Sequence, residues 1–506
     1  MLKLTDNPLK VNRMNPIKQL SLLTFLWILG HTSLHAQGLN FNDTSYNNVL
    51  KKKSSLVVNE DGLPPKVDLS MYVPSVLNQG TLGTCVGFST AYYMRTILEA
   101  KRLNITNKDS IDALRFSPSF LYNAIKSPND DACKKGAEVA NALEFLKTNG
   151  VARLSQQGYP DCTPMTSLQP ATESKIMDYI RLFGLNDRQE DIVIATKKAL
   201  AEGTPVVIAI QTTPSLDELG FWPKLWMRIL RFFGIGSGDE YGLWDPNKSD
   251  NLRGGHAVCV VGYDDKKFGG AFHVVNSRGE DWGEDGFFWI RYDDYTKHTK
   301  YGFQAYLSPN NYTTEALRSG DVTIELANLR PVELPFTRQS PEGNTTDNEP
   351  LVAYSLRDPQ QTDTEYKFRI NVDKQTYLYV LGANATQPSV DKLFPIDSIS
   401  PVVGANTKVF LPSEEQVYAL NEVTGTESWL FLFSDKEVNI DSCITAMNGQ
   451  KGTFTQRVQK VMGSKLLNYE QIDYKTKKMG FELREKHEGR IVPLLITLEH
   501  IKRRDL

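Results

Sequence analysis

Residues 78–89 read NQGTLGTCVGFS, a run in which a cysteine stands six positions after a glutamine with glycines on both sides. Apolar residues continue at helical spacing after Cys85 and predict a helix that begins at this cysteine. The positive end of the helix dipole would face the sulfur and favour thiolate over thiol. The glycines let a substrate backbone approach, so that the Cys85 amide and the Gln79 side chain can donate to a developing oxyanion. The stretch therefore predicts a thiol nucleophile with its oxyanion hole.

Two later segments supply the other groups that such a nucleophile requires. His256 follows a glycine pair and enters an apolar run, residues 257–263, that predicts a buried strand. Asn276 ends a second apolar run and precedes a glycine-rich turn. Neighbouring strands would hold the two side chains together, with His256 as the base and Asn276 orienting it. The alternatives are a buried structural histidine, a turn-forming asparagine and, for Cys85, an inert core thiol.

In the order Gln79, Cys85, His256, Asn276, these segments resemble papain-like cysteine peptidases. The resemblance covers residues 63–308 and implies a two-lobed catalytic domain with a helical lobe and a β-barrel-like lobe. It implies that Gln79 and the Cys85 amide form the oxyanion hole, that Cys85 is the nucleophile, that His256 is the general base and acid, and that Asn276 orients it. Protein or peptide substrates are implied, and neither a metal nor an organic cofactor.

The resemblance extends to residues around the triad. Gly136, Gly255 and Trp282 are expected to border the substrate, with packing as the alternative for Trp282. Cys133 and Cys162 flank the middle section as one disulfide of the family does, which implies that they pair.

The chain also departs from the family pattern at three positions. Val86 replaces a tryptophan directly after the nucleophile, and Lys135 replaces the first of a glycine pair that faces substrate. Arg278 stands where the family has a tryptophan that shields the histidine–asparagine hydrogen bond, and its charge would disfavour a nearby imidazolium. Two alternatives to an endopeptidase follow. One is a catalytically impaired papain fold used for binding or as a scaffold, and the other is an amidase or transpeptidase of cell-wall peptides.

Length and composition set the frame for these expectations. A chain of 506 residues is too long for one core and indicates two or three domains. The net charge of -3, with basic residues dispersed, gives no indication of nucleic-acid binding. An apolar stretch at residues 20–30, followed by Ser-Leu-His-Ala at residues 33–36, predicts a signal peptide over residues 1–36, hence a secreted, periplasmic or cell-surface protein, with an uncleaved anchor as the alternative. The polar residues 37–62 predict a linker.

An insertion is predicted at residues 211–250 of the catalytic domain. Within residues 224–233, one helical stripe is apolar and another is basic. We expect a helix packed as a rim or lid over the substrate site, and a membrane-surface helix is the alternative.

The remainder of the chain is rich in short β-prone runs. Residues 309–350 are expected to be a linker with the first strands, and residues 351–506 a mainly β, sandwich-like accessory domain. This part resembles a domain of unknown function that is attached to bacterial peptidases and kinases. The predicted fold class of the whole chain is therefore α+β. Strands are predicted at residues 368–372, 376–381, 408–412, 428–433 and 491–498, and a charged helix near residues 457–467.

Overall fold

The computed structural model describes most of the chain beyond the predicted signal peptide. The described residues are 38–52, 62–164, 170, 174–219, 242–246, 251–307, 319–326, 336–339, 351, 353–387, 389–396, 398–404, 407–413, 416–485 and 489–503. The predicted signal peptide and the predicted helix at 224–233 lie outside these residues, so both stay predictions.

One mixed sheet organises the first half of the chain. Among the described residues it has eight strands in the order β2-β8-β3-β5-β6-β7-β4, with β1 paired to β5. All strand pairs are antiparallel except β4 with β7. Its strands are β1 Lys66–Asp68, β2 Asp178–Arg181, β3 Val206–Gln211, β4 Leu243–Trp244, β5 Gly255–Asp264, β6 Ala271–Val275, β7 Phe287–Arg291 and β8 Thr299–Tyr306. The apolar run after His256 is the central strand β5, as expected from its composition.

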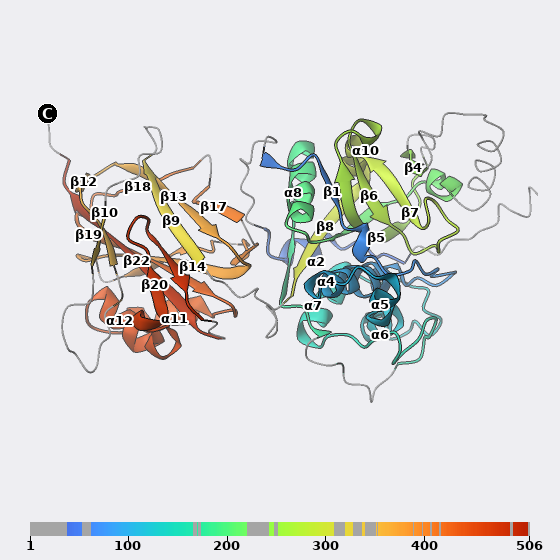
Figure 1. Ribbon diagram of the computed structural model, residues 1–506, viewed down its shortest axis with the longest axis horizontal. Helices are drawn as coiled ribbons and strands as arrows, with labels where there is room; N and C mark the ends of the chain where they lie inside the picture. Colours follow the sequence, from blue (N-terminus) through green and yellow to red (C-terminus); the bar gives the residue numbers. More distant parts are fainter. Residues whose placement is uncertain are drawn as a thin grey trace, which may run out of the picture.

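Helices gather on one side of this sheet and form a separate lobe (Figure 1). The helix that begins at Cys85 continues to Arg102 through three segments, and the middle one is a π-helix. The segments are α3 Cys85–Gly87, η3 Phe88–Arg95 and α4 Thr96–Arg102, and the neighbouring helices are α5 Lys108–Ala113, α6 Pro118–Ile125 and α7 Val139–Thr148. Ser117 caps α6 by accepting from the Phe120 amide, and Pro118 suits its first turn. Helices and sheet share one hydrophobic core, which includes Cys85 and Cys259.

Further helical elements of this half are the 3-10 helix η2 Ser70–Tyr72, α8 Gln189–Ala201, the 3-10 helix η5 Pro214–Leu219, the 3-10 helix η8 Lys267–Gly269 and α10 Tyr292–His298. Only the two ends of the predicted insertion are described, and η5 lies in its first part.

The second half is a sandwich of two sheets with a core between them, as predicted. The larger sheet has the order β10-β11-β22-β19-β14-β15 and the smaller one β17-β13-β9-β21-β20. The larger sheet contains β10 Phe336–Gln339, β11 Ala353–Leu356, β12 Gln360–Gln361, β14 Thr376–Asn384, β15 Val390–Phe394, β16 Val402–Val403, β19 Gly425–Ser434 and β22 Ile491–Ile501, and the smaller one β9 Ser319–Leu326, β13 Glu365–Val372, β17 Thr407–Leu411, β18 Tyr418–Ala419, β20 Ile472–Tyr474 and β21 Gly480–Leu483. Alternate residues of β14 face this core and the opposite side of the sheet.

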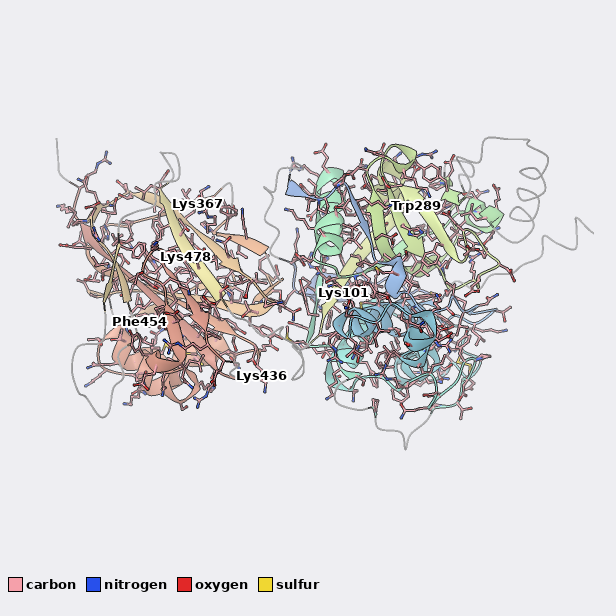
Figure 2. All side chains as sticks on the ribbon, in the orientation of Figure 1. Lys101, Trp289, Lys367, Lys436, Phe454 and Lys478 are labelled. Carbon is pink, nitrogen blue, oxygen red and sulfur yellow. A yellow bond between two sulfur atoms is a disulfide. The ribbon has the colours of Figure 1, made fainter. Side chains whose placement is uncertain are left out.

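Two helices cover the outer face of the larger sheet. They are α11 Ile440–Asn448 and α12 Phe454–Met462, which begins at the Phe454 labelled in Figure 2. Their apolar residues pack on Tyr377 and Tyr379 of β14, in a cluster that Ile180 and Tyr306 of the first half join. The two halves, which lie side by side in Figure 1, therefore share apolar contacts.

Residues 38–52, expected to belong to a polar linker, are instead ordered against the first half. They contain α2 Asp43–Asn48, whose Asn42 side chain accepts from the Ser45 amide. Tyr46 is fully buried, stacks on Tyr301 with ring centroids 4.4 Å apart and donates to the Phe183 carbonyl at 2.7 Å. Leu39, Tyr46 and Val49 are isolated apolar residues in a polar run, too few to predict a packed segment. We call residues 38–52 the strap.

The observed elements confirm the α+β fold class. None of the helices in the described part of the chain combines the length and the apolar character that crossing a bilayer requires.

Candidate active site

Cys85 stands at the first position of its helix, as predicted, but it is fully buried. Burial raises the pKa of the Cys85 thiol to about 11, although backbone hydrogen bonds with Ala257 and Gly38 oppose the shift. The direction is opposite to the one expected from the helix dipole alone. In this structure Cys85 is therefore held as a neutral thiol.

The structure brings His256 and Asn276 together at the ends of adjacent strands. His256 lies at the start of β5 and Asn276 directly after β6, its antiparallel neighbour. The His256 Nε2 atom and the Asn276 Oδ1 atom are 2.8 Å apart, and both residues are buried. The Asn276 backbone carbonyl accepts from the Tyr93 hydroxyl at 2.8 Å, and the Asn276 backbone amide donates to the Gly286 carbonyl at 3.0 Å. The asparagine is thus fixed from both lobes.

The same region holds the cysteine and the glutamine. The α3 segment that begins at Cys85 packs against β5, the strand that carries His256, and the backbone of Ala257 lies close enough to lower the pKa of the Cys85 thiol. The Gln79 side-chain oxygen accepts a short hydrogen bond from the Ser277 hydroxyl, and its Nε2 donates to the Leu82 carbonyl at 2.9 Å. Because Ser277 holds the oxygen, the N–H edge of the amide is turned toward the turn that precedes Cys85.

The predicted substrate-facing wall at Gly136 is built on a buried carboxylate. Asp130 accepts from the Lys134 amide at 2.8 Å and from the Tyr122 hydroxyl at 2.6 Å. That hydroxyl in turn accepts from the Gly136 amide at 2.9 Å. The disulfide between Cys133 and Cys162, implied by the family resemblance, is formed in this structure.

The strap covers this site. Leu39 donates its amide to the Gly255 carbonyl at 3.3 Å, and Asn40 donates to the Ala137 carbonyl at 2.9 Å. The Ala137 amide donates to the Gly38 carbonyl at 2.9 Å. The chain thus forms a short ladder between the Gly136–Ala137 wall and the strand that begins at Gly255.

Glycines permit this close packing. A Cβ atom on Gly38 would lie 2.0 Å from the Gly83 carbonyl oxygen, and one on Gly136 would lie 2.6 Å from the Gly38 oxygen. A Cβ atom on Gly255 would lie 2.7 Å from the Phe41 ring. Gly136 and Gly255, expected to border the substrate, therefore border the strap.

The Gly38 carbonyl is not presented as a substrate. Its oxygen is engaged by the Ala137 amide, while the Gln79 Nε2 atom donates to Leu82. The strap thus fills the site without offering this carbonyl to the expected oxyanion hole.

Two aromatic residues close in sequence to Asn276 have packing roles in the structure. Trp282 is 4% exposed and meets Phe288 edge-to-face at 5.8 Å. His273 is stacked between Phe287 and Trp289, which Figure 2 labels in the sheet. Burial lowers the pKa of His273 to about 4, so this histidine stays neutral at physiological pH.

Arg278 has a partner that the sequence did not indicate. Its side chain is 8% exposed and pairs closely with Asp217 of η5, which also pairs with Arg253. The guanidinium lies 5.7 Å from the centre of the Trp282 ring. Burial lowers the pKa of Arg278 from its ordinary value, and Asp217 opposes that shift. The predicted insertion therefore contributes a carboxylate that neutralises this charge.

Sequence reasoning missed the strap residues Gly38 and Leu39, and it missed Asp217. Neither set carries a local signal, since a glycine beside a leucine and a lone aspartate are common in any loop. Ser277, which holds Gln79, lies within the segment of Asn276 and could have been found there. The described residues hold no cluster of three or more His, Cys, Asp or Glu side chains suited to a metal ion.

Comparisons with known proteins agree with the residue types found here. The family model for Papain family cysteine protease matches residues 240–307, which include His256 and Asn276. The chain is 27% identical over 228 residues to an uncharacterized peptidase C1-like protein of Acanthamoeba polyphaga mimivirus, covering 43% of this chain and 64% of that protein. It is 26% identical over 233 residues to cathepsin K of Mus musculus, covering 45% of this chain and 60% of that protein. The chain thus spans less than two thirds of the length of these two relatives. The chain is therefore similar in sequence to papain-family cysteine peptidases.

Solved structures with similar backbones were also found. Xylellain, a cysteine protease from Xylella fastidiosa, is 23% identical with a TM-score of 0.39, covering 54% of this chain and 96% of that chain. The bromelain protease from Ananas comosus is 20% identical with a TM-score of 0.35, covering 48% of this chain and 100% of that chain.

Proposed function

We propose that this protein is a secreted cysteine endopeptidase in which Cys85, His256 and Asn276 form the catalytic triad and Gln79 contributes to the oxyanion hole. The observation that carries the proposal is the 2.8 Å contact between His256 Nε2 and Asn276 Oδ1, at the start of the strand β5 against which α3, the segment that begins at Cys85, is packed. A thiol beside an oriented imidazole is the arrangement that nucleophilic catalysis requires.

In the proposed reaction, the thiol proton of Cys85 passes to Nδ1 of His256, because Nε2 faces Asn276. The sulfur then attacks the substrate carbonyl carbon, and the C=O electron pair moves onto the oxygen. Gln79 and the Cys85 amide donate hydrogen bonds to this oxyanion. The amine leaves with the proton from His256, and water, activated by the same imidazole, hydrolyses the acyl-enzyme.

The strap makes the described state a closed one. Gly38 and Leu39 lie between the two walls that a peptide substrate would have to occupy. Turnover therefore requires the strap to leave the site, and the thiol then regains contact with solvent.

A thiol-specific epoxide tests the proposal. We expect it to label one thiol in Gly38→Ala, in which the new methyl group displaces the strap, and to label none in Gly38→Ala/Cys85→Ser. The labelled protein should lose its cleavage of an unstructured protein substrate. No labelling of the opened variant would mean a scaffold rather than an enzyme. Labelling with cleavage of purified peptidoglycan, but not of protein, would mean an amidase of cell-wall peptides.

Two further proposals, secretion and the role of the second half, rest on the sequence rather than on the geometry of the site. Secretion depends on the signal peptide predicted over residues 1–36, which the described residues do not include. The resemblance of residues 351–506 to a domain of unknown function stays a prediction, and we propose that this sandwich is an accessory domain.

A further inference from the structure

The far end of the strap lies between the two halves of the molecule. On one edge, the Lys52 amide donates to the Arg181 carbonyl at 2.8 Å, and the Arg181 amide donates to the Leu50 carbonyl at 3.0 Å. On the other edge, the Lys51 amide donates to the Ser398 carbonyl at 2.6 Å, and the Ser400 amide donates to the Lys51 carbonyl at 2.9 Å. Leu50 and Lys52 thus pair with the first half of the molecule, and Lys51 between them pairs with the sandwich.

The part of the sandwich that bonds to Lys51 is a turn with a defined conformation. Ile399 donates to the Ile396 carbonyl at 3.1 Å, and Ser398 has a φ of 39°, a left-handed conformation that is uncommon outside glycine. Ser400 is fully buried, and its hydroxyl accepts from the Val402 amide at 3.1 Å. The two backbone groups that bond Lys51 are therefore held in place by the sandwich itself.

Charged side chains strengthen the same junction. The Lys52 Nζ atom lies 2.7 Å from Glu202 and donates to Gln304 at 2.9 Å, and the Lys52 side chain is 9% exposed. A Cβ atom on Gly404 of the sandwich would lie 2.7 Å from Glu202, so this carboxylate touches both the strap and the sandwich. The Lys51 Nζ atom pairs with Asp187 at 2.7 Å.

The strap is one continuous piece from this junction to the active site. Residues 38–52 are all described, and Tyr46 of α2 is packed between the two ends. When the strap opens as a unit, the equilibrium between closed and open states depends on every contact that it makes, wherever the contact lies. A bond made by the sandwich to Lys51 therefore adds to the closure over Cys85.

We propose that the C-terminal sandwich is a clamp on the strap, so that displacement of the sandwich promotes opening of the active site. This inference rests on the proposed function of Cys85, and it goes beyond that function by assigning the accessory domain a regulatory role. The sandwich acts on the cysteine through residues 38–52, which it grips at Lys51.

A proline substitution separates this clamp from the other anchors. Lys51→Pro removes the amide that donates to Ser398 and leaves the Leu50 and Lys52 groups that pair with Arg181. Lys51→Ala is the matched control, because it loses the ion pair to Asp187 and keeps the amide. Ser400→Pro removes the amide of the sandwich that donates to the Lys51 carbonyl. Gly38→Ala serves as the benchmark for an opened site.

The readout is the rate at which iodoacetamide alkylates Cys85 in the full-length protein, followed by mass spectrometry. Cys259 and Cys443 are buried free thiols of the two halves, and their unchanged rates show that each half remains folded. We expect Lys51→Pro and Ser400→Pro to raise the Cys85 rate about three- to tenfold, the factor that the loss of one backbone hydrogen bond produces. Lys51→Ala should change it less than twofold, because this partly exposed ion pair is weak.

The outcomes separate the clamp from the peptidase proposal. Fast alkylation in Gly38→Ala, with wild-type rates in both proline variants, would show that the strap closes independently of the sandwich and would overturn the clamp. Wild-type rates in Gly38→Ala as well would show that the strap does not protect Cys85. Accelerated alkylation in the proline variants without any peptide cleavage would uphold the clamp and refute the peptidase.

Discussion

The buried thiol of Cys85 leads to a quantitative prediction about the strap. In the closed state its pKa is about 11, against an ordinary value of 9.0, and burial is the main cause. Gly38→Ala should expel the strap, because the added Cβ atom would lie 2.0 Å from the Gly83 oxygen, which belongs to rigid backbone. We expect the pKa of Cys85 to fall toward or below the ordinary value once the site opens.

The size of the effect follows from the two pKa values. At pH 8, a thiol with a pKa of about 11 is about 0.1% thiolate and one with a pKa of about 9 is about 10% thiolate, a difference of roughly a hundredfold. Iodoacetamide reacts with the thiolate, so the Cys85 alkylation rate at pH 8 should rise by about this factor in Gly38→Ala. The rate should be measured from pH 6 to pH 11 in both proteins, with Cys259 as the internal reference.

The sign of the pH dependence is also determined. A raised pKa of an acid means that the closed state favours the protonated thiol, so closure is fully favoured below pH 9 and weakens as the pH rises toward 11. The loss is about 1.4 kcal/mol per pH unit in that window. Cys85→Ser should remove this dependence. Equal alkylation midpoints in the wild type and Gly38→Ala would refute the view that the strap keeps the thiol neutral.

Three further changes test other parts of the structure. In an opened background, Asn276→Ala should lower turnover about ten- to a hundredfold with little change in Tm, since it orients His256 without reacting; a loss as deep as that of the nucleophile variant would contradict this role. Asp217→Asn should lower the free energy of unfolding by about 1–3 kcal/mol, because it leaves the Arg278 charge buried without its partner, and Arg278→Trp should restore stability in that background; equal denaturant midpoints would argue against a structural ion pair. Tyr46→Ala should weaken strap docking by about 3–5 kcal/mol and Tyr46→Phe by about 1–3 kcal/mol, and protease sensitivity of the strap that is the same in both variants would count against this anchor.

Local sequence was sufficient to single out the residues that form the candidate site. Cys85, His256 and Asn276 are each embedded in a distinctive run of glycines and apolar residues, and such runs specify a helix start or a strand end through short-range periodicity. The β-prone runs of the second half likewise predicted its main strands, because a short run of β-branched and aromatic residues is a local property.

The tertiary structure alone decided whether the site is open. Leu39, Tyr46 and Val49 are scattered through a polar segment, and their burial depends on partners such as Tyr301 that lie more than 200 positions away in the chain. The same holds for Asp217, which meets Arg278 only because η5 folds back onto the turn after β6. The sequence by itself therefore determined which residues are the candidates for the chemistry, through short-range patterns. Only the fold determined that Cys85 is covered, and that a strap held by the second half covers it, because burial and ion pairing are set by contacts between residues that are distant in the chain.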